Sequence, residues 1–150
     1  MVGKQLVVLK DVPSVPISYV KRDRVFHEKL RNEFGSGIRR DFLKSLTENP
    51  MTLKQLKELN LTEKDIDLIK NGRLPKGYKV HHKLPLDDSG DNSFENLILI
   101  KKTPYHSSLT NEQMNLTKEL QPGESKKIDF PIPKGSIFNH IKDGEVIEVE

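Results

Sequence analysis

The sequence of 150 residues predicts one α+β unit, in which a helical N-terminal half packs on a hairpin and helix and a short β tail ends the chain. Three observations predict this fold. Apolar residues recur every fourth position in the first half, a pair of histidines opens a strand-loop-strand stretch in the middle, and alternating patterns return near the end. We expect residues 1–77 to be mostly a helical platform, residues 78–112 to form the hairpin and helix, and residues 113–150 to complete that helix and form the tail.

The first half predicts a series of short helices. The first two carry apolar faces that we expect in the core (Phe26, Leu30 and Phe34; then Ile38, Phe42 and Leu46). We expect Gly35 and Gly37 to separate these helices, and Asn49-Pro50 to end the second. Thr52 is the predicted N-cap of a third segment. Thr62 and Asp65 have the spacing of a capping box for a fourth, which Gly72 ends.

The middle of the chain holds three of its five histidines. An extended segment from Tyr78 to His82 points His81 and His82 to opposite sides. A polar loop with Pro85 and Gly90 follows, and residues 97–100 are an apolar run typical of a buried strand.

A helix is predicted after this second strand. Thr103 is its expected N-cap, Pro104 its first position, and His106 lies in its first turn. In a compact hairpin packed on that helix, His81 and His106 come within the ~4 Å span set by two metal–nitrogen bonds of ~2.1 Å. His82 faces elsewhere and is free to accept a proton. One divalent metal beside one general base is sufficient to hydrolyse a phosphodiester.

These residues resemble the HNH nucleases of the ββα-metal superfamily, and within it the bacterial DNase toxins of the colicin and pyocin kind and related polymorphic toxins. The resemblance covers about a fifth of the chain and rests on a short set of positions (His81-His82, Pro85, Gly90, Asn96, the apolar strand, Thr103-Pro104 and His106). It implies that His81 and His106 are metal ligands and that His82 is the base that activates water. It also implies that Asn96 holds the loop so that His82 is correctly aimed.

The chain departs from the colicin pattern at two places. Thr110 stands where those domains usually have another histidine, one helical turn after the helix ligand. Water, a phosphate oxygen or the Thr110 hydroxyl can be the third ligand, which favours Mg²⁺ or Mn²⁺ and leaves Ni²⁺ or Zn²⁺ as alternatives. Lys79 and Val80 precede the paired histidines, where the colicin pattern has an acidic residue, so any role of that acid does not transfer.

Taken singly, each residue has an ordinary structural explanation, and only the ordered set favours catalysis. Two alternatives stay open. One is a noncatalytic nucleic-acid-binding module with a structural metal, although the chain lacks Cys and a fourth protein ligand. The other is a ribonuclease, or a restriction, phage or repair enzyme with the same motif. If the histidines act as proposed, activity falls below roughly pH 6, where free imidazoles become charged.

Charge is unevenly distributed. Residues 1–80 contain 17 Lys and Arg against 10 Asp and Glu, a balance of +7, and residues 81–150 have a balance of −4. The basic half is a candidate surface for DNA phosphates, with Arg73 and Lys79 in it and Lys83 just beyond it as candidate contacts. The toxin resemblance implies duplex DNA cut with little sequence preference, and an acidic immunity protein that covers the basic face.

The sequence predicts a soluble protein without disulfides. It contains no Cys, and no apolar run approaches the ~18 residues of a membrane span. If the chain is a toxin, it is the effector domain of a larger delivered protein and acts in the cytoplasm of the target bacterium; otherwise the expected location is the cytoplasm of its own cell.

Overall fold

The computed structural model describes residues 4–10, 12–86 and 90–149, and its mixture of helices and strands confirms the α+β prediction. The helices are α1 (Arg24–Glu33), α2 (Arg39–Glu48), α3 (Pro50–Glu58), α4 (Glu63–Lys70), α5 (Ser107–Thr117) and α6 (His140–Asp143). The strands are β1 (Lys4–Leu9), β2 (Ser14–Val20), β3 (Tyr78–His82), β4 (Leu97–Lys101), β5 (Ser125–Pro131) and β6 (Gly144–Val149).

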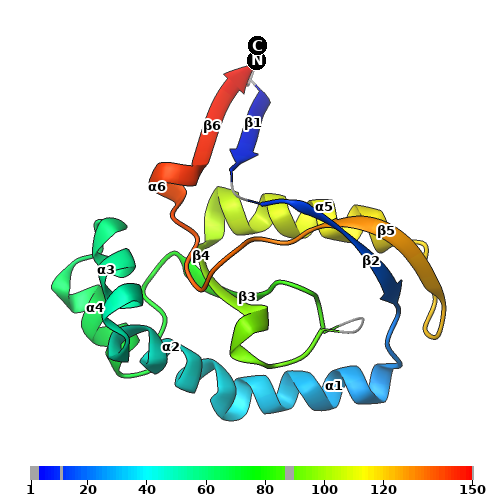
Figure 1. Cartoon of the computed structure of the whole chain (residues 1–150), viewed down its shortest axis with the longest axis horizontal. Helices are drawn as coiled ribbons and strands as arrows, with labels where there is room; N and C mark the ends of the chain where they lie inside the picture. The colour runs from blue at the N-terminus through cyan, green and yellow to red at the C-terminus, as the bar shows by residue number, and fades with distance from the viewer. Residues whose placement is uncertain (1–3, 11, 87–89, 150) are drawn as a thin grey trace.

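All six strands of the described residues form antiparallel pairs. The β3–β4 hairpin lies in the middle of the molecule, with α1 and α2 along one side and α5, β2 and β5 along the other (Figure 1). The β1–β6 pair extends away from the rest, and Lys4 lies opposite Val149, so the first and last described residues are neighbours (Figure 1).

The first twenty residues correct one expectation. Residues 1–77 were predicted to be mostly a helical platform, and helices do occupy most of residues 24–70, but β1 and β2, which were not predicted, precede them and pair with the two strands of the C-terminal tail. Strand pairing depends on a partner more than a hundred residues away, as in the register of Ser14 with Pro131, and no local pattern reports it.

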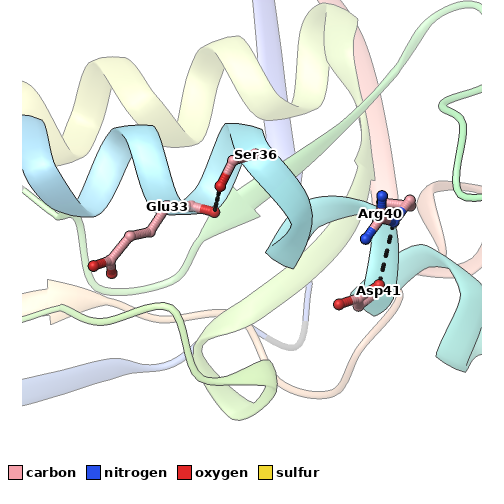
Figure 2. A network of polar contacts seen from close by, with 4 residues as sticks. All are labelled: Glu33, Ser36, Arg40 and Asp41. Atoms are coloured by element: carbon pink, nitrogen blue, oxygen red, sulfur yellow. Dashed lines mark hydrogen bonds and ion pairs between the residues drawn. The ribbon is translucent and has the colours of Figure 1, made fainter.

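The connection between α1 and α2 corrects another. Gly35 and Gly37 do not separate two helices, because a wider π-type turn, Phe34–Ile38, joins α1 to α2. Neither glycine has a positive φ, so both keep the helical backbone. In Figure 2, the Ser36 hydroxyl donates to the Glu33 carbonyl at 3.1 Å in this turn, and the Arg40–Asp41 ion pair of 3.3 Å lies just beyond it at the start of α2.

The helix termini agree with the sequence in part. Thr62 and Asp65 form the predicted capping box of α4. The cap of α3 is not Thr52 but Asn49, whose side chain accepts from Met51 N while Pro50 occupies the first turn. In α1 no residue is buried, and Phe26 is 46% exposed, so the expected core face of this helix is wrong at that position.

The core has two parts, divided by β4. One part joins the helical platform to Val80 and Ile137 and includes Leu97 and Leu99 of β4. The other lies against α5 and includes Ile98 and Ile100 of β4, with Tyr105, Leu109 and Phe138. Successive side chains of a strand point to opposite faces, and all four apolar residues of β4 are fully buried. The hairpin is therefore fixed between the platform and α5. Across the described residues, none of the helices has the length and apolar character that a membrane span requires.

Candidate functional site

The two adjacent histidines of β3 lie on opposite faces of the hairpin, as the sequence predicts. His81 pairs with Ile98, and His82 pairs with Leu97. Directly paired residues of an antiparallel sheet present their side chains on the same face. Because Ile98 packs toward α5 and Leu97 toward the helical platform, His81 faces α5 and His82 faces the platform.

His81 and His106 meet on the α5 side. Their ring centroids are 5.0 Å apart, with an interplanar angle of 74°. His81 is 7% exposed, and its buried Nε2 has no hydrogen-bond partner among the described residues. A buried polar atom without a partner is unfavourable unless it has a ligand. His81 Nε2 is therefore an atom that could bind a metal ion, for which neutral imidazole nitrogen is a common ligand.

The electrostatics keep both rings neutral. Burial lowers the pKa of His81 to about 3, helped by the neighbouring His106, His82 and Lys79. Burial also lowers the pKa of His106 to about 4, helped by the charges of Lys79 and Lys102. Both imidazoles are thus uncharged at neutral pH and have a lone pair available, which metal binding requires.

Thr110 follows His106 by one helical turn. Its hydroxyl lies 3.3 Å from His106 Nε2, so an oxygen atom that could be a third ligand lies beside the pair. Nearby, the buried Gln113 amide donates to the carbonyls of Lys83 and Pro131, which fixes α5 to the end of the hairpin. In the portion of the chain that the structure describes, no cluster of three or more His, Cys, Asp or Glu side chains is placed to hold a metal.

The start of α5 agrees with the prediction in part. Thr103 has the extended backbone of an N-cap residue (φ −124°, ψ 130°), but none of the described hydrogen bonds joins its side chain to the helix that follows. The chain kinks at Thr103, and Ser107 Oγ donates to Lys102 O at 3.2 Å. His106 immediately precedes α5 with helical φ and ψ. The predicted placement of His106 at the start of this helix holds.

His82 occupies a different environment, on the platform side. Its Nε2 lies 2.9 Å from Asn92 Oδ1, and the Phe34 ring packs against its ring with centroids 4.4 Å apart. Burial lowers the pKa of His82; the Asn92 hydrogen bond acts against this, Arg31 adds to it, and Asp91 opposes it. His82 is accordingly neutral at physiological pH and is held by contacts separate from those of the His81–His106 pair.

Asn96 holds the loop between the strands. Its Oδ1 accepts from Leu84 N at 2.9 Å, and its Nδ2 donates to Leu84 O at 2.9 Å and to Asp91 O at 2.8 Å. This agrees with the expected role in fixing the loop. The contact with His82 is made by Asn92, which the sequence analysis missed, because an Asn in a polar run has no pattern that distinguishes it from a turn residue. Residues 87–89 of this loop lie outside the described residues.

The three candidate phosphate contacts lie in different places. Lys79 is exposed and close enough to His81 and His106 to lower both pKa values. Lys83 is half-buried, which lowers its pKa, and it lines an open hollow of about 580 Å³ together with Asn96 and Asp91. Arg73 follows α4, where its N–H donates to Leu68 O, and none of the described contacts joins it to the histidines. Lys102, which was not predicted, lies near His106.

One comparison with known proteins gives a relative. YhhZ of Escherichia coli (strain K12), described as an uncharacterized protein, is 38% identical to this chain over 136 residues. The similarity covers 91% of this chain and 33% of YhhZ, so the chain spans about a third of the length of that relative. No protein-family model matches the chain, and no solved structure matches it.

Proposed function

We propose that the protein is a metal-dependent endonuclease that hydrolyses DNA phosphodiester bonds. The observation that supports this most is the division of three histidines between two faces of one hairpin. His81 is buried and His106 half-buried, both rings are neutral, His81 Nε2 has no hydrogen-bond partner among the described residues, and His82 lies apart with its own hydrogen-bond partner. The strand, loop, strand and helix that carry them follow the order of the nuclease group that the sequence resembles.

In this proposal His81 and His106 hold one divalent ion, with Mg²⁺ or Mn²⁺ favoured. A bound ion would offset the charge that builds on the phosphate and the leaving oxygen. His82 takes the proton from the attacking water, for which its lowered pKa keeps it unprotonated. Lys79 and Lys102 supply positive charge beside the pair and attract the phosphate backbone. The expected products carry 5′-phosphate and 3′-hydroxyl ends.

The biological proposal follows the same resemblance. The chain acts as the toxic effector domain of a larger delivered protein, in the cytoplasm of a target bacterium, and cuts duplex DNA with little sequence preference. The producing cell would protect itself with an acidic immunity protein bound to the basic face. Co-expression tests this: expression of the chain in a bacterium should kill it unless the neighbouring gene supplies the inhibitor.

A plasmid-nicking assay tests the activity. The protein is incubated with supercoiled plasmid and Mg²⁺, Mn²⁺, Ni²⁺ or Zn²⁺, each against an EDTA control, and with total RNA in parallel. We expect nicking with at least one ion, no nicking in EDTA and no discrete banding. Metal binding without cleavage of either nucleic acid would instead identify a noncatalytic module, and cleavage of RNA alone would identify a ribonuclease.

Two histidine variants separate the roles. His82→Ala should abolish cleavage and leave metal affinity nearly intact, whereas His106→Ala should weaken metal binding by roughly ten-fold or more as well as cleavage, because it removes a ligand. Calorimetric titration with Mn²⁺ measures the metal affinity, and the nicking rate measures cleavage. His27→Ala, on α1 and outside the cluster, is the matched control and should change neither. The reverse pattern in the two variants would refute the assignment.

A further inference from the structure

Asn92 connects the proposed base to a distant helix. Its Oδ1 lies 2.9 Å from His82 Nε2, and its Nδ2 donates to the backbone carbonyl of Leu30 at 3.0 Å. Leu30 belongs to α1, 62 positions earlier in the chain, and the amide is partly buried between the two partners. One side chain therefore joins β3, the loop and α1.

The Leu30 carbonyl determines the direction of both hydrogen bonds. A carbonyl oxygen can only accept, so the amide nitrogen of Asn92 must face Leu30 and its oxygen must face His82. An amide oxygen also only accepts. The proton of this second bond must therefore lie on His82 Nε2, and in the neutral ring Nδ1 then carries the lone pair.

Among the described residues, Asn92 makes the one hydrogen bond to the His82 ring, while Arg31 and Asp91 act on the ring through their charges. Phe34 contacts the His82 ring through its own ring and has no hydrogen-bonding atom. Asn96 uses its oxygen for Leu84 N and its nitrogen for two backbone carbonyls, so its side chain is committed to the loop. The tautomer of His82 thus depends on Asn92, and the loop geometry depends on Asn96.

We infer that Asn92 is a positioning residue that fixes His82 as the Nε2-protonated tautomer, so that Nδ1 is the atom that accepts the proton from water. The inference rests on the proposed function for the use of Nδ1, but the tautomer itself is a property of the folded protein. Because the other end of the amide is attached to α1, any displacement of that helix is transmitted to the base.

The tautomer is read directly by long-range ¹H–¹⁵N NMR of the histidine rings in the metal-free protein near pH 8, with the His82 signals identified by their loss in His82→Ala. We expect a predominantly Nε2-protonated His82 in the unmodified chain and a mixture of tautomers in Asn92→Ala. A His82 ring protonated mainly on Nδ1, or an unchanged ring in Asn92→Ala, would overturn the inference.

Kinetics distinguish positioning from a purely structural link. Asn92→Ala should lower kcat by roughly 10–100-fold, the range typical of residues that orient a functional group, with KM and Mn²⁺ affinity unchanged. Asn92→Asp keeps an oxygen acceptor for His82 but removes the donor to Leu30, so it should recover a large part of kcat and retain the Nε2-protonated ring. Equal losses in the Ala and Asp variants would show that the link to α1 alone matters and would contradict the inference.

The control is Asn115→Ala, which removes an exposed asparagine of α5 and should leave the His82 ring and kcat unchanged. Failure of the proposed function is distinguishable from failure of this inference. If the unmodified protein cuts no nucleic acid under any metal condition, the nuclease proposal fails, and the NMR comparison still decides whether Asn92 sets the tautomer.

Discussion

Asn96 shows how much one side chain can do for the geometry of a site. Its amide satisfies one backbone N–H and two backbone carbonyls on the loop side of the hairpin, at distances of 2.8 to 2.9 Å. Leu84 supplies two of those groups, so the end of β3 and the start of β4 are held together at this point.

Asn96→Ala should therefore destabilise the protein and slow cleavage. Leaving the partly buried groups of the loop without partners costs about 1–3 kcal/mol, and each kcal/mol lowers the Tm of a domain of this size by roughly 2–4 °C. Thermal unfolding measures the loss of stability, and the nicking rate measures the loss of cleavage. Asn115→Ala, at an exposed position, should leave the Tm within about 1 °C. An Asn96→Ala protein with unchanged Tm would mean that the loop does not depend on these bonds.

At the residue scale, the sequence predicts which side chains can carry out the chemistry better than it predicts which side chains touch one another. The opposite directions of His81 and His82 follow from the two-residue period of a strand, and the structure has them so. The Asn92 contact could not be predicted in this way. It requires that α1 pass beside the loop, and nothing within a few residues of Asn92 reports that.

The β3–β4 hairpin depends on close backbone packing where its loop returns. Gly90 is buried, and a Cβ built on it would overlap the carbonyl of Leu84 and lie 2.6 Å from Pro85 O. Both obstacles are backbone atoms, which cannot rotate away as a side chain can. A glycine is required here by space rather than by φ.

Gly90→Ala should accordingly destabilise the loop, by about 1–3 kcal/mol, as expected for overpacking. Gly35→Ala is the matched control, because no atom lies within 4 Å of its added Cβ and its backbone is helical. There the substitution should stabilise the protein by about 0.5–1 kcal/mol, since alanine loses less backbone freedom than glycine. Urea unfolding of both variants tests the pair, and equal effects of the two substitutions would show that Gly90 is not sterically constrained.

The helices of the platform show which properties of a helix are set by residues close together in the sequence. The Thr62–Asp65 capping box and the stop at Asn49-Pro50 were predicted, because a cap involves residues three positions apart or fewer. Continuity through Gly35 and Gly37 was not predicted. Glycine permits both a helix and a break, and packing of Phe34 and Ile38 against the platform core accompanies the continuous form.

For the whole molecule, the buried His81 and the half-buried His106 couple folding to pH. The pKa values of His81 and His106 are about 3 and about 4 in the folded protein, against about 6.5 in an unfolded chain. Below pH 6.5 the unfolded state therefore binds more protons than the folded state. The free energy of unfolding must decrease as pH falls from about 6.5 toward 4.

Urea unfolding of the metal-free protein at pH 7.5, 6 and 5 measures this dependence. We expect the midpoint to fall steadily across the series, and His106→Gln to show a shallower decrease because it lacks one of the titrating rings. The range lies above the region where Asp91, whose pKa is lowered chiefly by its hydrogen bond with Ser93, would contribute. A midpoint that rises on acidification would contradict the burial of neutral imidazoles. The same pKa values mean that His81 and His106 should lose their capacity to bind a metal at a pH lower than the roughly pH 6 expected from free imidazoles.

By itself the sequence determined the α+β class, the buried strand at residues 97–100, the caps of α4, and the opposed directions of His81 and His82. These properties follow from side-chain periodicity and from hydrogen bonds between near neighbours. Only the tertiary structure decided the pairing of β1 with β6 and β2 with β5, the meeting of His81 with His106, and the contact of Asn92 with His82 and Leu30. Each of these joins segments far apart along the chain, and their proximity arises from packing of the whole core.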